Sequence, residues 1–166
     1  GEEPESPACL GGIVVQAQAP VAARAYLQKT AKRLRLETNA WTAITALPHI
    51  LTNRPCGMSA VGFEALGFRS EPASRRILVQ EGRTNDANFT LHALPATLLL
   101  TCIATNAEIR ITNHVARIPD PVSVPSLQPV SVTVMAPGQR TQTLTLGPFD
   151  PLTTNRHAVT LEREVG

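Results

Sequence analysis

Residues 130–146 read VSVTVMAPGQRTQTLTL, and this stretch decides the fold of the second half of the chain. Before the turn at residues 136–140, valines alternate with hydroxyl residues; after it, apolar residues alternate with threonines. Alternation with a period of two on both sides of a Pro-Gly turn predicts an antiparallel β-hairpin. We therefore expect a β-rich second half whose hairpin carries an uncharged polar row on its outer face: Ser131, Thr133, Thr141, Thr143 and Thr145.

This polar row is the candidate interface of the chain. Edge strands usually carry charged residues that discourage pairing with another chain, and the row has none. We therefore predict that this face or edge is covered, either by the proline-rich segment at residues 119–129 or by a protein partner. The inner face of the hairpin has only small aliphatic residues, so we expect helices from the N-terminal part to complete its core.

The N-terminal part is predicted to be mainly helical. Residues 20–36 fit a helix with an apolar face at positions 23, 27, 31 and 34, although residues 34–36 also fit a strand. Further helices are expected at residues 38–47 and 58–66, because Thr38 or Asn39 could cap the first and Gly67 could end the second.

From about residue 72 the pattern changes to short strands, including residues 76–80, 89–94, 108–111 and 157–164. Residues 95–104 fit either a strand or a helix. Helices followed by strands predict an α+β fold, with a short helical N-terminal portion packed on an antiparallel β-sheet or sandwich. We expect a tail at residues 1–12, a mainly helical portion at 13–72 and a β portion at 73–166, together one compact domain of 166 residues.

The net charge of the chain is only +2, but positive charge is concentrated in the first expected helix. Five basic residues on its polar half are candidate contacts for phosphates or for an acidic partner. This patch makes nucleic-acid binding through phosphates, as in a ribonucleoprotein or virion, one version of the predicted function. The five residues are Arg24, Lys29, Lys32, Arg33 and Arg35.

The sequence carries no strong catalytic, metal or cofactor motif. Residues 57–62, GMSAVG, are one residue longer than a nucleophile elbow, so Ser59 is only an alternative hydrolase nucleophile. The four histidines are isolated, and no glycine-rich phosphate loop occurs. We therefore predict no catalytic residue, no metal and no cofactor.

Cysteine spacing and hydropathy give weak information about the compartment. The three cysteines are expected to be reduced, although one disulfide remains open, as does glycosylation at Asn88 in the triplet Asn88-Phe89-Thr90. No apolar run approaches the roughly 18 residues that would span a bilayer. The compartment, the partner and the oligomeric state are not indicated.

Residues 34–79 resemble the PUB domain, a small helical module that binds peptide tails of an ATPase. Residues 34–41, LRLETNAW, are similar to the Ile-Arg-Ile-Gly-Asn-x-Ala-Phe signature of that family, although Thr38 falls where the signature has Asn. Residues 65–68, ALGF, followed by ILV at 77–79, look like its Met-Gly-Phe turn and next strand. Residues 49–54 would be an insertion, and the last third of the chain has no counterpart.

The leading prediction is a non-enzymatic structural or protein-interaction subunit of a larger assembly, with a protein partner. The resemblance implies the first alternative, a peptide-recognition module that binds an ATPase tail. A hydrolase that uses Ser59 is the second alternative.

Overall fold

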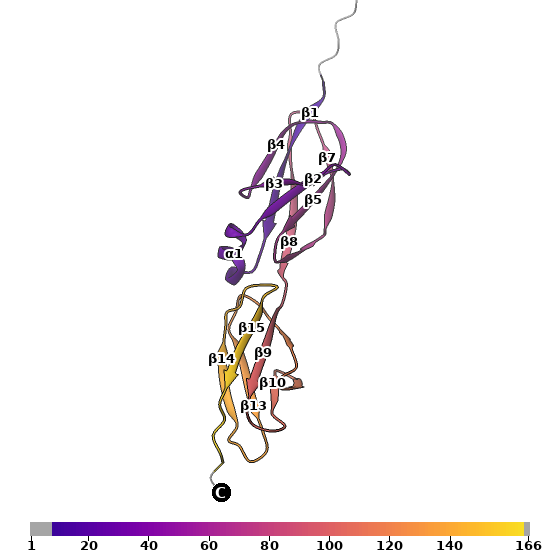
Figure 1. Cartoon of the computed structure of the whole chain (residues 1–166). Coiled ribbons are helices and arrows are strands. Elements are labelled where there is room, and N and C mark those ends of the chain that lie inside the picture. Colours follow the sequence, from indigo (N-terminus) through magenta and orange to yellow (C-terminus); the bar gives the residue numbers. More distant parts are fainter. Residues whose placement is uncertain (1–7, 165–166) are drawn as a thin grey trace, which may run out of the picture. The chain divides into compact units, whose positions relative to one another are not determined.

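The computed structural model describes residues 8–164 of the chain, which divides into two compact units, unit 1 up to His92 and unit 2 from Ala93. Fifteen strands and one short α-helix make up the regular structure of the described residues, apart from a single 3₁₀ turn (Figure 1). The predicted α+β fold is therefore wrong, and both units are all-β. No helix within residues 8–164 is long and apolar enough to cross a membrane.

Unit 1 is a sandwich of two four-stranded sheets. Strand β1 pairs antiparallel with β4 and parallel with β8, whereas all pairs in the other sheet are antiparallel. The first sheet has the order β4 (His49–Pro55), β1 (Leu10–Gln18), β8 (Thr84–Ala93), β6 (Phe68–Glu71). The second sheet has the order β3 (Thr42–Ile44), β2 (Lys32–Leu36), β5 (Gly57–Ala65), β7 (Ser74–Val79).

Aromatic contacts join the two sheets of unit 1. Phe63 from β5 and Phe89 from β8 are at most 1% exposed, and their ring centroids lie 5.6 Å apart. The short helix α1 (Arg24–Lys29), preceded by the 3₁₀ turn η1 (Val21–Ala23), places Tyr26 with its ring centroid 5.9 Å from that of Phe68. These contacts bury apolar rings, which is the main source of stability for such a sandwich.

The three predicted N-terminal helices are largely strands. The residues expected at 58–66 form β5, because Ser59, Val61, Phe63 and Ala65 all face the core with a period of two. The residues expected at 38–47 contain β3. Within residues 20–36 only α1 and η1 are helical, and residues 32–36 form β2. Of the expected apolar face, Ala23 and Leu27 are buried in η1 and α1, but Ala31 is exposed and Leu34 belongs to β2, so the helical spacing holds only for the first two positions.

Unit 2 contains a four-stranded and a three-stranded sheet. Strand β9 pairs antiparallel with β12 and parallel with β15, so residues 95–104 are mostly strand. The four-stranded sheet has the order β11 (His114–Arg117), β10 (Glu108–Ile111), β13 (Val130–Met135), β14 (Gln142–Leu146). The three-stranded sheet has the order β12 (Val122–Val124), β9 (Ala96–Cys102), β15 (Thr154–Val159).

The predicted hairpin is confirmed in unit 2. Strands β13 and β14 pair antiparallel, with Val132 opposite Leu144. The inner side chains Val132 and Val134 are fully buried and pack in one cluster with Leu98 and Leu100 of β9. The core is therefore completed by strands of unit 2, and the expected cover of N-terminal helices is wrong.

The proline-rich segment at residues 119–129 does not cover the hairpin edge. Its residues 122–124 form β12, which pairs with β9 in the other sheet of unit 2. The flanking prolines Pro121 and Pro125 end this strand after three residues, because proline cannot donate to a ladder.

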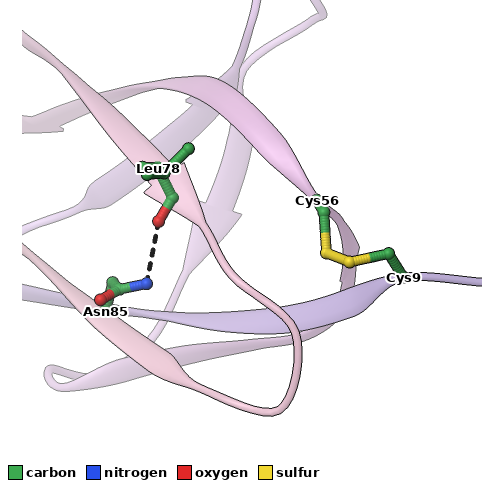
Figure 2. Close-up of a disulfide and its surroundings, with 4 residues drawn as sticks. All are labelled: Cys9, Cys56, Leu78 and Asn85. Carbon is green, nitrogen blue, oxygen red and sulfur yellow. Dashed lines mark hydrogen bonds between the residues drawn. A yellow bond between two sulfur atoms is a disulfide. The ribbon is translucent and has the colours of Figure 1, made fainter.

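A disulfide between Cys9 and Cys56 links the start of β1 to the connection between β4 and β5 (Figure 2). The two Cα atoms lie 5.4 Å apart, and the Cys56 amide donates to the Cys9 carbonyl at 3.1 Å. The expectation of three reduced cysteines is wrong for this pair, because the fold brings together two residues that are 47 positions apart. Cys102 is free.

Side chains also connect β7 with β8 of the opposite sheet. The Asn85 side-chain amide donates to the Leu78 carbonyl at 2.8 Å, as Figure 2 shows, and Arg75 Nε donates to the Asn88 carbonyl. Each of the two strands thus has one carbonyl group that accepts from a side chain of the other, and β7 is the edge strand of its sheet.

Candidate functional site

The five basic residues that were expected on one helix do not lie on one surface. Arg24 and Lys29 lie on α1, whereas Lys32, Arg33 and Arg35 lie on β2, where successive residues face opposite sides. The ribonucleoprotein or virion interpretation rested on that helix, and the structure gives it no support.

Lys32 faces inward and is only 5% exposed. Its Nζ donates to the carbonyls of Gln28 at 3.3 Å and Thr30 at 3.0 Å, and so satisfies backbone acceptors at the end of α1. Desolvation by burial lowers the pKa of Lys32 from its ordinary value of 10.5. This lysine therefore serves the packing of unit 1 and does not offer its charge to a ligand.

Arg33 and Arg35 face outward and stack on Trp41. The guanidinium carbons lie 4.7 Å and 4.9 Å from the centre of the indole ring. Both distances are within the range of a favourable cation–π interaction, which holds the two long side chains in place. We call the three residues Arg33, Trp41 and Arg35 the arginine–tryptophan stack.

The backbone around β2 explains why Trp41 reaches these arginines. Glu37 adopts a positive φ of 55°, and its carboxylate accepts from the Ala60 amide at 2.9 Å. Its own amide donates to the Ala60 carbonyl at 2.8 Å, so the turn after β2 is fixed to β5. The chain then returns as β3, in which Thr42 lies opposite Leu34, and Trp41 lies beside Arg35.

The two arginines differ in their partners on β5. Arg33 lies opposite Glu64, and its Nε donates to Glu64 Oε2 at 2.6 Å, with Nη2 contacting the same oxygen. Arg35 lies opposite Gly62, and no ion pair or side-chain hydrogen bond within residues 8–164 involves it. Arg35 is therefore a fixed guanidinium whose donors are not used by the neighbouring strands.

The threonine row occupies the outer face of β13 and β14. Ser131 lies opposite Thr145 and Thr133 opposite Thr143, whose Oγ1 atoms are 3.4 Å apart. Thr141 lies just before β14, in a surface hollow of about 250 Å³ that Arg140, Gln142, Thr160 and Glu162 also line. The structure thus brings four of the five predicted residues into one row and places Thr141 beside it.

The first and last strands of each unit pair with each other in parallel. In unit 1, residues 12–18 of β1 pair in parallel with residues 84–90 of β8. In unit 2, residues 97–102 of β9 pair in parallel with residues 154–159 of β15. Because the paired strands run in the same direction, the chain enters and leaves each unit at opposite ends of it.

The structure gives the hydrolase alternative no catalytic geometry. Ser59 is 8% exposed within β5, opposite Ile77, and the hydrogen bonds between described side chains include none from a histidine to Ser59. Among residues 8–164, no three His, Cys, Asp or Glu side chains gather in a group that could hold a metal ion.

The PUB-like segments are strands and turns. Residues 34–41 run through the end of β2 and the following turn, and residues 65–68 form the turn between β5 and β6. A helical peptide-binding module is therefore excluded for residues 34–79, because the resemblance rested on short apolar motifs that both folds accommodate.

No family model matches the chain, and no curated protein matches its sequence. Among solved structures, the chain is similar to the TIE protein of Bacillus anthracis, with 13% identity and a TM-score of 0.50. That match covers 93% of this chain and 34% of the TIE protein, so the chain spans about a third of its length.

Two further solved structures are similar at lower TM-scores. A streptococcal ancillary pilin has 10% identity and a TM-score of 0.35, over 96% of this chain and 64% of the pilin. A leucine-rich repeat protein from Bacteroides thetaiotaomicron has 11% identity and a TM-score of 0.34, over 93% of this chain and 26% of that one. Of these three structures, only the TIE protein, with a TM-score of 0.50, supports a shared fold.

The arginine–tryptophan stack could have been found in the sequence only in part. Residues 32–36, KRLRL, alternate basic and apolar residues, which is a strand pattern with both arginines on one face. The contact with Trp41 depends on the turn at Glu37 and on the pairing of β2 with β5, and neither has a local signal.

Proposed function

We propose that the chain is a non-enzymatic structural module that carries tension between neighbouring parts of a larger assembly. The observation that supports the proposal is the parallel pairing of the first and last strands in both units. Two units with the same arrangement, in one chain, fit a role in spacing or tethering better than a role in catalysis.

The parallel pairs give each unit resistance to stretching. Force on the two ends of a unit pulls its first and last strands past each other, in opposite directions along their axes. The ladder hydrogen bonds between them are then loaded together instead of one after another. In unit 1 seven residue pairs share this load, and in unit 2 six pairs do so.

The disulfide supports a location outside reducing compartments. Disulfides persist in oxidising surroundings such as the cell surface or secreted material, and they are rare where thiols are kept reduced. The Cys9–Cys56 bridge also joins the entry point of unit 1 covalently to the end of the edge strand β4, which suits a module under tension.

Single-molecule force spectroscopy on the full chain tests the proposal. In one arrangement the handles are attached to the two chain ends. In the other, the second handle is attached at Leu152, which is 61% exposed and lies just before β15. Force then reaches β9 and β15 at the same end, so their hydrogen bonds open one by one.

We expect a clearly higher rupture force for unit 2 with terminal handles than with the handle at Leu152. Equal rupture forces in the two arrangements would contradict the proposal. Unit 1 serves as the internal control, because both arrangements load it through its own ends.

We further propose that the threonine row and the β14 edge form a contact surface in the assembly. Most edge strands of the described sheets contain an arginine, for example Arg54 in β4 and Arg156 in β15. Three edges lack a charged residue, and β14, with five residues, is longer than β3 and β12, with three each. Residues 138–140, just before β14, pair with residues 162–164 of the same chain, so the uncharged edge proposed for strand addition by a partner is β14 itself.

Matched lysine substitutions separate the edge from the face. Thr143→Lys and Thr145→Lys add charge on the edge strand β14, whereas Ser131→Lys adds the same charge on the inner strand β13. If β14 accepts a partner strand, the two β14 variants lose copurifying partners or self-association and Ser131→Lys retains them. Loss with all three variants would indicate the face, and loss with none would reject this surface.

A further inference from the structure

On the outer face of β2 and β5, two neighbouring arginines differ in whether a carboxylate binds them. In one row, Arg33 faces Glu64 and binds its carboxylate through Nε and Nη2. In the next row, Arg35 stacks on the same indole ring but faces Gly62, over which the Trp41 ring lies, so no carboxylate binds Arg35 from β5. The second arginine thus repeats the arrangement of the first without its carboxylate.

We propose that Arg35, held by Trp41, is a docking site for a carboxylate side chain of a partner polypeptide. A guanidinium presents its donors in a planar fork that matches a carboxylate, and charge-assisted hydrogen bonds of this kind are among the stronger ones. Stacking on Trp41 fixes the fork before the partner arrives, which reduces the entropy lost on binding. The contact between Arg33 and Glu64 is the example of this chemistry in the chain itself.

The same face offers apolar contacts that a polypeptide can use and an anionic polysaccharide cannot, and Arg76 of β7, opposite Ala60, lies between them and Arg35. Met58 and Leu78 lie opposite each other on β5 and β7 and are 53% and 50% exposed. Met58 is four residues from Gly62, so it faces the same side at about 13 Å along the strand. An extended peptide with an acidic residue and, four positions away, an apolar residue would engage both places.

This inference is independent of the tension argument, because it concerns one outer face of unit 1 and not the terminal strands. A failure of the force experiment would leave it intact, and a failure of the binding experiment would leave the proposed structural role intact.

Trp41 is the only tryptophan of the chain, so its fluorescence reports directly on the site. The probe is the blocked pentapeptide Glu-Ser-Thr-Ser-Leu, titrated at low salt into the full chain, with Gln-Ser-Thr-Ser-Leu as the uncharged control. We expect a saturable change in Trp41 emission with the Glu peptide and an affinity lower by about tenfold or more with the Gln peptide.

Three variants test the role of Arg35. Arg35→Gln should weaken binding of the Glu peptide by about tenfold or more, because the charged donor is lost. Arg35→Lys keeps the charge but not the planar fork of donors. Its affinity for the Glu peptide should therefore lie between those of the original chain and Arg35→Gln. Arg110→Gln, which removes an exposed arginine from β10 in unit 2, should leave binding unchanged. Far-UV circular dichroism confirms that each variant is folded.

Several outcomes would overturn the proposal. Equal affinities for the Glu and Gln peptides, or an Arg35→Gln variant that binds as tightly as the original chain, would show that Arg35 does not receive a carboxylate. Saturable binding of heparin, with no binding of the peptide, would assign the face to a sulfated polysaccharide instead. No response to either probe would show that the stack is only structural.

Discussion

Trp41 lies over Gly62 on the outer face of unit 1. A Cβ atom at position 62 would come within 3.2 Å of Trp41 Cη2 and within 3.8 Å of the Arg35 Cβ. The first distance is tighter than ordinary van der Waals contact, so the indole ring fits this place because residue 62 has no side chain.

Gly62→Val is therefore expected to displace Trp41 and to disrupt its stacking with Arg33 and Arg35. We expect unit 1 to lose about 1–3 kcal/mol of stability, the usual range for overpacking. Urea denaturation followed by Trp41 emission measures both the stability and the exposure of the ring. Ala60→Val, on the same face of the same strand, is the matched control. An unchanged emission maximum in Gly62→Val would contradict the expected displacement.

The hairpin at residues 130–146 could be predicted because its information is local. Val130, Val132 and Val134 alternate with polar residues, the turn sequence lies between the two runs, and both strands pair with each other. The sequence also predicts β10 as a strand, whereas residues 95–104, which contain β9, fit either a strand or a helix, and no strand outside the hairpin has a predicted partner. Long-range pairing, such as β1 with β8, leaves no mark in a short window of sequence.

The prediction of a helical N-terminal half is wrong for a physical reason. Residues 23, 27, 31 and 34 have helical spacing, but Lys32 is buried and Leu34 and Leu36 follow it with a period of two. Charged residues usually prefer the surface, so the sequence predicts a polar face for position 32, where the structure has a buried lysine. The stacking of Arg35 on Trp41 depends on a strand, a turn and a distant glycine that the helix prediction excluded.

The Cys9–Cys56 disulfide is expected to stabilise unit 1 selectively. For two residues 47 positions apart, the loss of chain entropy in the unfolded state corresponds to about 4 kcal/mol. Replacing both cysteines with serine should lower the stability of unit 1 by about 2–4 kcal/mol. Trp41 and Tyr26 belong to unit 1, so fluorescence follows that unit alone, and circular dichroism follows both.

Cys102→Ser is the control for the disulfide prediction, because Cys102 is a free thiol in β9 of unit 2. It should leave the fluorescence transition unchanged. A double serine variant whose fluorescence transition matches that of the original chain would show that the bridge adds no stability to unit 1.

Reduction of the disulfide is also expected to change the length that unit 1 releases under force. While the bridge is intact, the chain segment between Cys9 and Cys56, which are 47 positions apart, cannot extend. At about 3.5 Å per residue, reduction should add about 160 Å to the contour length released when unit 1 unfolds. Unit 2, in which no disulfide joins described residues, should release the same length in both conditions. An identical release from unit 1 before and after reduction would show that the cysteines are not joined.

Lys32 is expected to make the stability of unit 1 depend on pH in the alkaline range. Burial lowers its pKa in the folded state below the ordinary value of 10.5 that it regains on unfolding. Between these two values the unfolded state binds more protons, so the free energy of unfolding should rise as the pH increases through the folded pKa towards 10.5. Below the folded pKa, Lys32 is charged in both states and contributes no slope.

The comparison of Lys32→Met with Lys29→Met isolates this effect. Lys29 is exposed on α1, so Lys29→Met should keep the alkaline rise in the free energy of unfolding. Lys32→Met should lose this rise, because no proton is released at position 32. Urea denaturation followed by Trp41 emission, repeated from neutral pH to 10.5, measures the slope in each variant. Lys32→Met also removes the donor to the carbonyls of Gln28 and Thr30, so its stability near neutral pH reflects lost hydrogen bonds as well as relief from burying a charge. The slope, not the absolute stability, therefore decides the prediction, and parallel curves for the two variants would show that Lys32 keeps its ordinary pKa in the folded state.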